Sequence, residues 1–328
     1  MSENEKKEVV NQEEKVINDK YISLTDGISL EKAIEEVNKN ETGFINYRTK
    51  ETRKSVILFF VLVALCIGTY LLSSVHQAFL WVTLALLVVG VVLLPNIIKK
   101  SKKGIEEAGT KVMTEYFYYI DSAVLHDESF KEVKYNFNDK MPMETFQDLR
   151  IIKDINSTGG RCVTIGKFLD YDFKAGDYLV KTLETISTGD KQQYIVFLGK
   201  LFVFEIPNLC SEGRMVIYLK GKGANGPTDI EDLKKVEGIL PSKYDLYSSC
   251  KVSEVLSERI VAILDQYVTT ESLIDMFITV DQNRVSFGFS YADSIMTLPL
   301  INPIDEEGAK QYYNDVEKMV KILKVLVK

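Results

Sequence analysis

The sequence predicts an α+β cytoplasmic domain that is anchored to a membrane by a hairpin of two transmembrane helices. Two long stretches in the first third of the chain contain no charged residue, and Lys and Arg residues cluster on their outer flanks. In the longer region that follows, strand-like and helix-like segments do not alternate regularly, which is typical of α+β domains.

The hairpin is predicted from residues 55–98. Its first limb, residues 55–72, reads SVILFFVLVALCIGTYLL, and its second, residues 79–98, reads FLWVTLALLVVGVVLLPNII. Each limb is close to the roughly 20 apolar residues that a helix needs to cross a bilayer core of about 30 Å. The short connection at residues 73–78 forces the two helices to run antiparallel.

Basic residues set the predicted orientation of this hairpin. They flank both limbs at the ends away from the turn, and the turn itself carries no Lys or Arg. Since cytoplasmic loops are enriched in Lys and Arg, we expect a multi-pass cell-membrane protein with both termini in the cytoplasm. Such clusters also attract anionic lipid head groups, by about 1 kcal/mol per residue. The boundary residues are Arg48, Lys50, Arg53, Lys54, Lys99, Lys100, Lys102 and Lys103.

Residues 1–54 are predicted to be an acidic cytoplasmic tail. Its first part is polar and poor in aromatic residues, as mobile segments are. Ser29 is a suitable N-cap for a short helix that ends at Lys39, because Glu31 and Glu35 suit the early turns of a helix.

Residues 104–328 are predicted to form the α+β domain. Apolar side chains at three- and four-residue spacing indicate helices, and segments rich in Val, Ile, Phe, Tyr and Thr indicate strands. Helices are expected at residues 104–125 (continuing out of the second limb), 141–152, 230–240, 253–267 and 306–327. Strands are expected at residues 162–165, 178–186, 193–198, 201–206, 214–220, 244–247, 276–280 and 285–291.

Two details of these strands are also predicted. Large apolar side chains alternate with Ser and Gly over residues 285–291, so one face of that strand is expected to be buried and the other wet. Gly199, between two strands, is expected to mark a bulge or bend.

Three short segments carry a resemblance to a known family. Residues 197–203 read FLGKLFV at the end of a strand pair, residues 244–248 read YDLYS before an amphipathic helix, and residues 285–289 read VSFGF in a hairpin. Behind a two-span hairpin, this order resembles a bacterial membrane-protein family catalogued as a domain of unknown function, serial number 3137. The resemblance covers the hairpin and most of the region after it, and it implies a fold and a membrane location but no activity.

The chain departs from that family ahead of the strands. Members often carry an acidic Gly-Glu-Asp element there, whereas this chain reads Gly159-Gly160-Arg161-Cys162. Members are often encoded near LemA-type membrane proteins, so the resemblance suggests a protein of that type as a partner.

Composition argues against several classes of function. The net charge of −7 does not suggest nucleic-acid binding. The four Cys residues include no C-x-x-C motif, so neither a zinc ribbon nor a disulfide framework is indicated. Between Lys54 and Lys99 the one ionisable residue is His76, in the turn, which argues against a transporter or channel subunit.

Two stretches that resemble binding motifs are better explained as loops. Residues 221–226 read GKGANG, a literal G-x-G-x-x-G, but Pro227 and the acidic residues that follow disfavour a dinucleotide phosphate there. Residues 154–165 begin like a calcium loop, but the twelfth position is Ile165 where the loop needs Glu. No cofactor and no metal site is therefore predicted.

These observations favour binding over catalysis. The predicted cytoplasmic part contains a single histidine, His126, and no G-x-S-x-G motif, so no catalytic residue is assigned. The main prediction is a membrane protein that presents a binding or scaffolding domain to a protein partner at the inner membrane face. The alternatives are a transporter or channel subunit and a membrane-tethered enzyme with a carboxylate-based site. The site of such an enzyme would be assembled around residues 171–178 or the loop at residues 221–226. Its candidate carboxylates are Asp170, Asp172 and Asp177, or Asp305, Glu306 and Glu307. A deep pocket lined by several polar groups would favour the enzyme.

Overall fold

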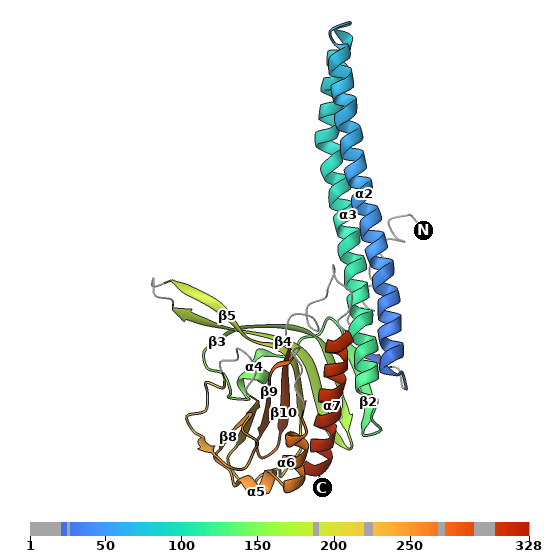
Figure 1. Cartoon of the computed structure of the whole chain (residues 1–328). Coiled ribbons are helices and arrows are strands. Elements are labelled where there is room, and N and C mark those ends of the chain that lie inside the picture. The colour runs from blue at the N-terminus through green and yellow to red at the C-terminus, as the bar shows by residue number, and fades with distance from the viewer. Residues whose placement is uncertain are drawn as a thin grey trace, which may run out of the picture. The chain divides into compact units, whose positions relative to one another are not determined.

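The computed structural model describes residues 21–24, 27–185, 190–219, 226–267, 273–291 and 306–327, with the backbone alone at residues 89, 184 and 185. These residues divide into two compact units. We call residues 35–116 the hairpin unit, and the described residues before 35 and after 116 the sheet domain. Figure 1 shows the two long helices of the first unit and the curved sheet of the second.

The hairpin unit consists of most of α2 (Leu30–Leu72) and α3 (Ala78–Val124). The Thr83 hydroxyl donates a hydrogen bond of 2.8 Å to the Thr69 hydroxyl across the two helices. Further along, the Leu62 side chain lies so close to Gly90 that a Cβ there would overlap it. In the same way, a Cβ at Gly104 would overlap the Tyr47 hydroxyl. All of these contacts fit one antiparallel register, so the helices lie side by side along much of their length (Figure 1).

Both helices are long and apolar enough to cross a membrane. Their apolar side chains point outward. For example, Phe60 is 63 % exposed, Trp81 70 % and Val91 74 %. This is the arrangement that a surface in contact with lipid requires, because a helix in a bilayer presents apolar side chains to its surroundings.

The predicted short helix at residues 29–39 is the beginning of α2, which runs without a break into the first limb. The linking residues contain no Pro, and Gly43 alone costs about 1 kcal/mol of helix propensity, too little to end a helix of this length. The expected continuation of the second limb into the helix at residues 104–125 is confirmed by α3, which passes through Pro95.

The sheet domain is built on one ten-stranded antiparallel sheet with the order β1-β2-β3-β4-β5-β10-β9-β6-β8-β7. Its central strands are β5 (Lys191–Phe204), β10 (Val285–Tyr291) and β9 (Leu273–Val280). The other strands are β1 (Ile22–Ser23), β2 (Phe130–Asn136), β3 (Ile155–Phe168), β4 (Tyr171–Thr185), β6 (Met215–Leu219), β7 (Lys234–Val236) and β8 (Tyr244–Ser248). With its helices, this sheet confirms the α+β class.

Helices cover both faces of the sheet. On one face α7 (Glu306–Leu326) lies against β10, next to α6 (Glu258–Asp265), as Figure 1 shows. Tyr312 of α7 stacks on Phe202 of β5. On the other face, Phe146 of the short helix α4 (Met143–Gln147) packs against the rings of Tyr178, Phe197 and Phe277.

The prediction that β10 has one wet face is wrong. All seven of its residues are buried, because β10 is a central strand between β5 and β9 and both of its faces are covered. The ring of Phe277 lies directly over Gly288, where any Cβ would overlap it. Likewise Gly199 does not divide two strands. It lies within continuous β5, where the backbone of β10 comes so close that a Cβ would overlap the carbonyl oxygen of Phe289.

The helix predicted at residues 230–240 is also absent. Arg214 donates hydrogen bonds to the carbonyl oxygen of Asp229 (2.8 Å) and to the Asp232 carboxylate (2.7 Å), and β7 then pairs with β8. These tertiary contacts hold the chain in turns and a short strand. The helix predicted at residues 253–267 is interrupted as well, into α5 (Val252–Val255) and α6, where Ser257 caps the second piece.

Candidate functional site

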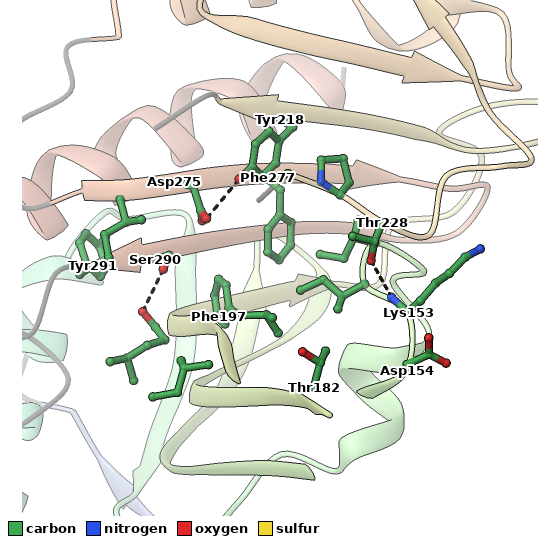
Figure 2. Close-up of a pocket in the computed structure, with 18 of the residues that line it drawn as sticks. Lys153, Asp154, Thr182, Phe197, Tyr218, Thr228, Asp275, Phe277, Ser290 and Tyr291 are labelled. Carbon is green, nitrogen blue, oxygen red and sulfur yellow. Dashed lines mark hydrogen bonds between the residues drawn. The ribbon is translucent and has the colours of Figure 1, made fainter. Parts of the chain in front are cut away.

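The sheet domain contains a pocket of about 820 Å³ on the face of the sheet that α4 covers. Figure 2 shows its lining, which comes from the ends of β4, β5, β6, β9 and β10 and from two connecting segments. The volume is in the range of small-molecule sites, which are commonly 300–1,000 Å³. The lining residues are Ile151, Ile152, Lys153, Asp154, Thr182, Leu183, Ile195, Val196, Phe197, Leu198, Tyr218, Gly226, Pro227, Thr228, Ile274, Asp275, Phe277, Ser290 and Tyr291.

Two connecting segments, residues 151–154 and 226–228, form one wall of the pocket and are tied together. The Thr228 amide donates to the carbonyl oxygen of Ile151 at 2.7 Å, and the Lys153 amide donates to the Thr228 hydroxyl at 2.9 Å. Beside the pocket, Phe146 fills the space between the sheet and α4. The pocket is therefore a continuation of the core that the side chains of the described residues leave open.

Asp275 is the one acidic side chain of this lining that is buried, at 8 % exposure. It shares a face of β9 with Phe277, and Phe277 pairs with Tyr218 of β6, so the Tyr218 hydroxyl reaches the Asp275 carboxylate. That hydrogen bond is long, at 3.3 Å to Oδ2. Oδ1 has no hydrogen-bond partner among the described residues. Burial raises the pKa of Asp275 to about 6, although the Tyr218 hydrogen bond opposes this shift.

Two hydroxyl groups add polarity to the lining. Thr182 is 7 % exposed, and its Oγ1 also has no partner among the described residues. The Ser290 hydroxyl is satisfied, since it donates to the carbonyl oxygen of Leu198 at 3.3 Å. The pocket thus combines an apolar surface with unpaired polar atoms at two points, which is the usual composition of a ligand site.

A separate polar cluster lies on the opposite face, beneath α7 and the end of α3. Lys200 of β5 contacts Asp121 of α3 at 2.9 Å and Asp177 of β4 at 3.2 Å. The hydroxyls of Tyr312 and Thr164 donate to Asp121 at 3.0 and 3.1 Å. All of these side chains are buried, so the cluster ties α3 and α7 to the sheet and offers no access to a substrate.

A second buried carboxylate links the pocket to α7. Asp315 accepts hydrogen bonds from Tyr267, from Gln311 and, at 2.8 Å, from Tyr291. Burial raises the pKa of Asp315 to about 7, and the three hydrogen bonds oppose that shift. Tyr291 is also a lining residue of the pocket, so its hydrogen bond to Asp315 connects that lining to α7.

The carboxylates considered for an enzymatic site do not come together. Asp177 is buried against Lys200, whereas Asp170 pairs with Lys131 at the exposed turn between β3 and β4. None of Asp170, Asp172, Asp177, Glu306 and Glu307 lines the pocket, and Asp305 lies outside the described residues. Residues 221–225 of the glycine-rich stretch lie outside the described residues, and residues 155–165 belong to a strand, not to a calcium loop. Among the described residues no cluster of His, Cys, Asp or Glu fit for a metal ion is found.

The predicted boundary residues all lie on the hairpin unit, within α2 and α3, where the apolar limbs end on the side away from the turn. The register given by Tyr47 with Gly104 and Leu62 with Gly90 places the basic groups of α2 and of α3 at one level. Some of their charge is offset, since Lys102 and Lys103 approach Glu106 and Glu107 at 3.9 and 3.4 Å. The basic residues therefore form a belt around both helices.

Sequence reasoning missed Asp275 and Thr182. A signal for the first was present, because Asp275 is the one charged residue in the apolar strand LIDMFITV. Comparison with protein-family models, with curated proteins and with solved structures found no match. The resemblance to the membrane-protein family stays a prediction.

Proposed function

We propose that this chain is an integral membrane protein that crosses the bilayer with α2 and α3 and presents its sheet domain as a binding module at the inner face of the membrane. The outward-facing apolar side chains of the hairpin unit carry this proposal. A contiguous apolar surface of this size is a liability in water, whereas it is the favoured surface in a bilayer.

The basic belt supports the proposed orientation. It surrounds both helices where the apolar limbs end, on the side away from the turn, while the turn itself has no Lys or Arg. Under the positive-inside rule this places both termini and the sheet domain in the cytoplasm. The same belt is suited to contact with anionic lipid head groups.

The pocket supports binding over catalysis. Asp275 is its single buried carboxylate, and the described carboxylates proposed for an enzyme lie elsewhere. General acid–base chemistry needs a second group within reach of the substrate, and the pocket's other acidic residue, Asp154, is exposed. The uncharged spans likewise lend nothing to a transport role.

Membrane insertion is tested by extracting membranes from cells that make the full chain. The chain should remain in the pellet after alkaline carbonate treatment. The double variant Leu65→Arg/Leu87→Arg places a charge near the middle of each span, at about 2.5–3.5 kcal/mol each, and should be released or degraded. Leu65→Ala/Leu87→Ala is the matched control and should stay in the pellet. Release of the unaltered chain by carbonate would overturn the proposal.

The binding role is tested by crosslinking in the same membranes. A protein partner, with a LemA-type membrane protein as the first candidate, should be captured by the unaltered chain and by the alanine control but not by the arginine variant. Turnover of phosphate esters, peptides or nucleotides by the purified chain would instead favour the enzymatic alternative.

A further inference from the structure

The starting point is an unpaired acceptor inside the pocket. Asp275 Oδ1 is buried and has no donor among the described residues, and Oδ2 has a single long hydrogen bond. A buried carboxylate without partners is costly, and such groups are normally paired with a cation or with several donors. Asp275 is one of the residues that line the pocket, and Figure 2 shows its carboxyl group beside the Tyr218 hydroxyl. Since the described residues supply no partner for Oδ1, the pocket offers a place for one.

The cationic side chain of the lining does not supply it. Lys153 Nζ forms an ion pair with Glu231, and Figure 2 shows its side chain pointing away from Asp275. Asp154, the other charged lining residue, has the same sign as Asp275 and is exposed. The interior of the pocket thus carries one acidic group with no basic neighbour in the lining.

The rest of the interior is apolar. The rings of Phe197 and Phe277, which both line the pocket, pack at a tilt of 53° with centroids 5.5 Å apart, and Ile151 belongs to the same apolar cluster. A ligand that matches this surface needs an apolar or aromatic body, because burial of such a body supplies most of the binding free energy. Thr182 Oγ1 is a second unpaired atom in the lining, available to a hydroxyl or amide on a larger ligand.

We propose that this pocket binds a small apolar molecule that carries one protonated amine, with the ammonium group on Asp275 and the apolar body against Phe197 and Phe277. A cation satisfies the unpaired oxygen and neutralises the buried charge, which a neutral donor does only in part. An anion is disfavoured, since it would meet a carboxylate of the same sign in a site of low polarity. This inference goes beyond the proposed function, and either can fail without the other.

The test uses the full chain in lipid nanodiscs and isothermal titration calorimetry with probes of one shape. The probes are 2-phenylethylamine (a cation), 2-phenylethanol (neutral) and 3-phenylpropionate (an anion). We expect saturable binding in the order amine, alcohol, anion, with empty nanodiscs as the blank. We also expect the affinity for the amine to fall at pH 5, because Asp275 is then largely protonated. Equal binding of amine and alcohol, or no saturable binding of the amine, would overturn the proposal.

Matched variants locate the binding. Asp275→Asn keeps the shape of the side chain but removes its charge, and should weaken the amine by about 10- to 100-fold, the range for a hydrogen bond to a charged group. Asp170→Asn removes an exposed carboxylate outside the lining and should leave affinity unchanged. The opposite pattern would overturn the assignment. If Asp275→Asn fails to fold, the probe series and its pH dependence in the unaltered chain still decide the question.

A lysine side chain of a protein could offer the same ammonium group. Nα-acetyl-lysine amide is therefore titrated in parallel. Tighter binding of 2-phenylethylamine supports a small apolar amine, whereas tighter binding of the lysine derivative would overturn it in favour of a peptide ligand.

Discussion

Lys200 Nζ lies 2.9 Å from Asp121 Oδ2, and the two side chains are 3 and 1 % exposed. Burial alone would lower the pKa of Lys200, but Asp121 and Asp177 raise it well above its usual value, so the ammonium form is retained. Because Asp121 belongs to the last turns of α3, this ion pair fastens that helix to the centre of the sheet.

Replacing Lys200 by Met should destabilise the sheet domain by about 3–5 kcal/mol, because two buried carboxylates would lose their cation. The measurement is urea unfolding of the full chain in micelles, followed by circular dichroism. Lys131→Met is the matched control. It removes an exposed pair, 3.5 Å from Asp170, and should cost less than about 1 kcal/mol. Similar losses for the two variants would contradict the role given to Lys200.

The close approach of β5 and β10 makes a second prediction. Gly199→Ala would push a methyl group into the carbonyl oxygen of Phe289 and should destabilise the domain by about 3 kcal/mol through displacement of β10. Gly159→Ala is the control in β3, where the nearest atoms to the new Cβ are side-chain atoms of Leu179 at 3.7 Å. In the same urea experiment, the free energy of unfolding should fall at least twice as much for Gly199→Ala as for Gly159→Ala.

Asp275 predicts a dependence of stability on pH. Its pKa is raised from 3.8 in its usual state to about 6 in the fold. Between those values the folded chain holds a proton that the unfolded chain has released, so the stability contributed by this group falls as pH rises from about 4 to about 6. Asp275→Asn removes that fall. Between pH 4 and pH 6 the free energy of unfolding of this variant should therefore rise by about 2–3 kcal/mol relative to that of the unaltered chain.

Ser290→Ala is the control for that experiment, because it changes the same lining without a titratable group. The difference in free energy of unfolding between Ser290→Ala and the unaltered chain should not change with pH. Asp315, whose pKa is about 7, contributes equally to all three chains and cancels in the differences. A constant difference for Asp275→Asn as well would show that its carboxyl group is not buried as described.

The composition and periodicity of the sequence predicted those helices and strands whose formation depends mainly on neighbouring residues. The two limbs follow from composition, and the C-terminal helix and the hairpin of β9 and β10 follow from periodicity. Residues 230–240 have a helical pattern, yet Arg214, which lies before them in the chain, binds Asp232 and prevents the helix. Propensity is a weak preference that such tertiary contacts override.

The candidate site was beyond the reach of the sequence for a related reason. Tyr218 and Asp275 are 57 residues apart and meet only because β6 pairs with β9. The environment of Lys200 depends in the same way on residues from α3, β4 and α7. A charged residue inside an apolar strand is visible in the sequence, but its partners and its pKa depend on the strand order.

Topology makes the last prediction, and the structure changes how it should be measured. Cys162, Cys210 and Cys250 are buried, so their failure to react with a reagent would not report on the side of the membrane. Engineered cysteines at exposed positions avoid this problem. Val75→Cys lies in the turn, where Val75 is 79 % exposed, and should be labelled by a membrane-impermeant maleimide in intact cells.

Lys131→Cys, at an exposed position of β2, should react with the same maleimide only after permeabilisation. Both variants need the Cys66→Ser background, because Cys66 lies within the first limb and is half-buried. The turn has no Lys or Arg while the belt at the other end of the hairpin is basic, which is why we expect the turn outside. Labelling of Lys131→Cys in intact cells, with Val75→Cys protected, would place the sheet domain and its pocket on the outer side of the membrane.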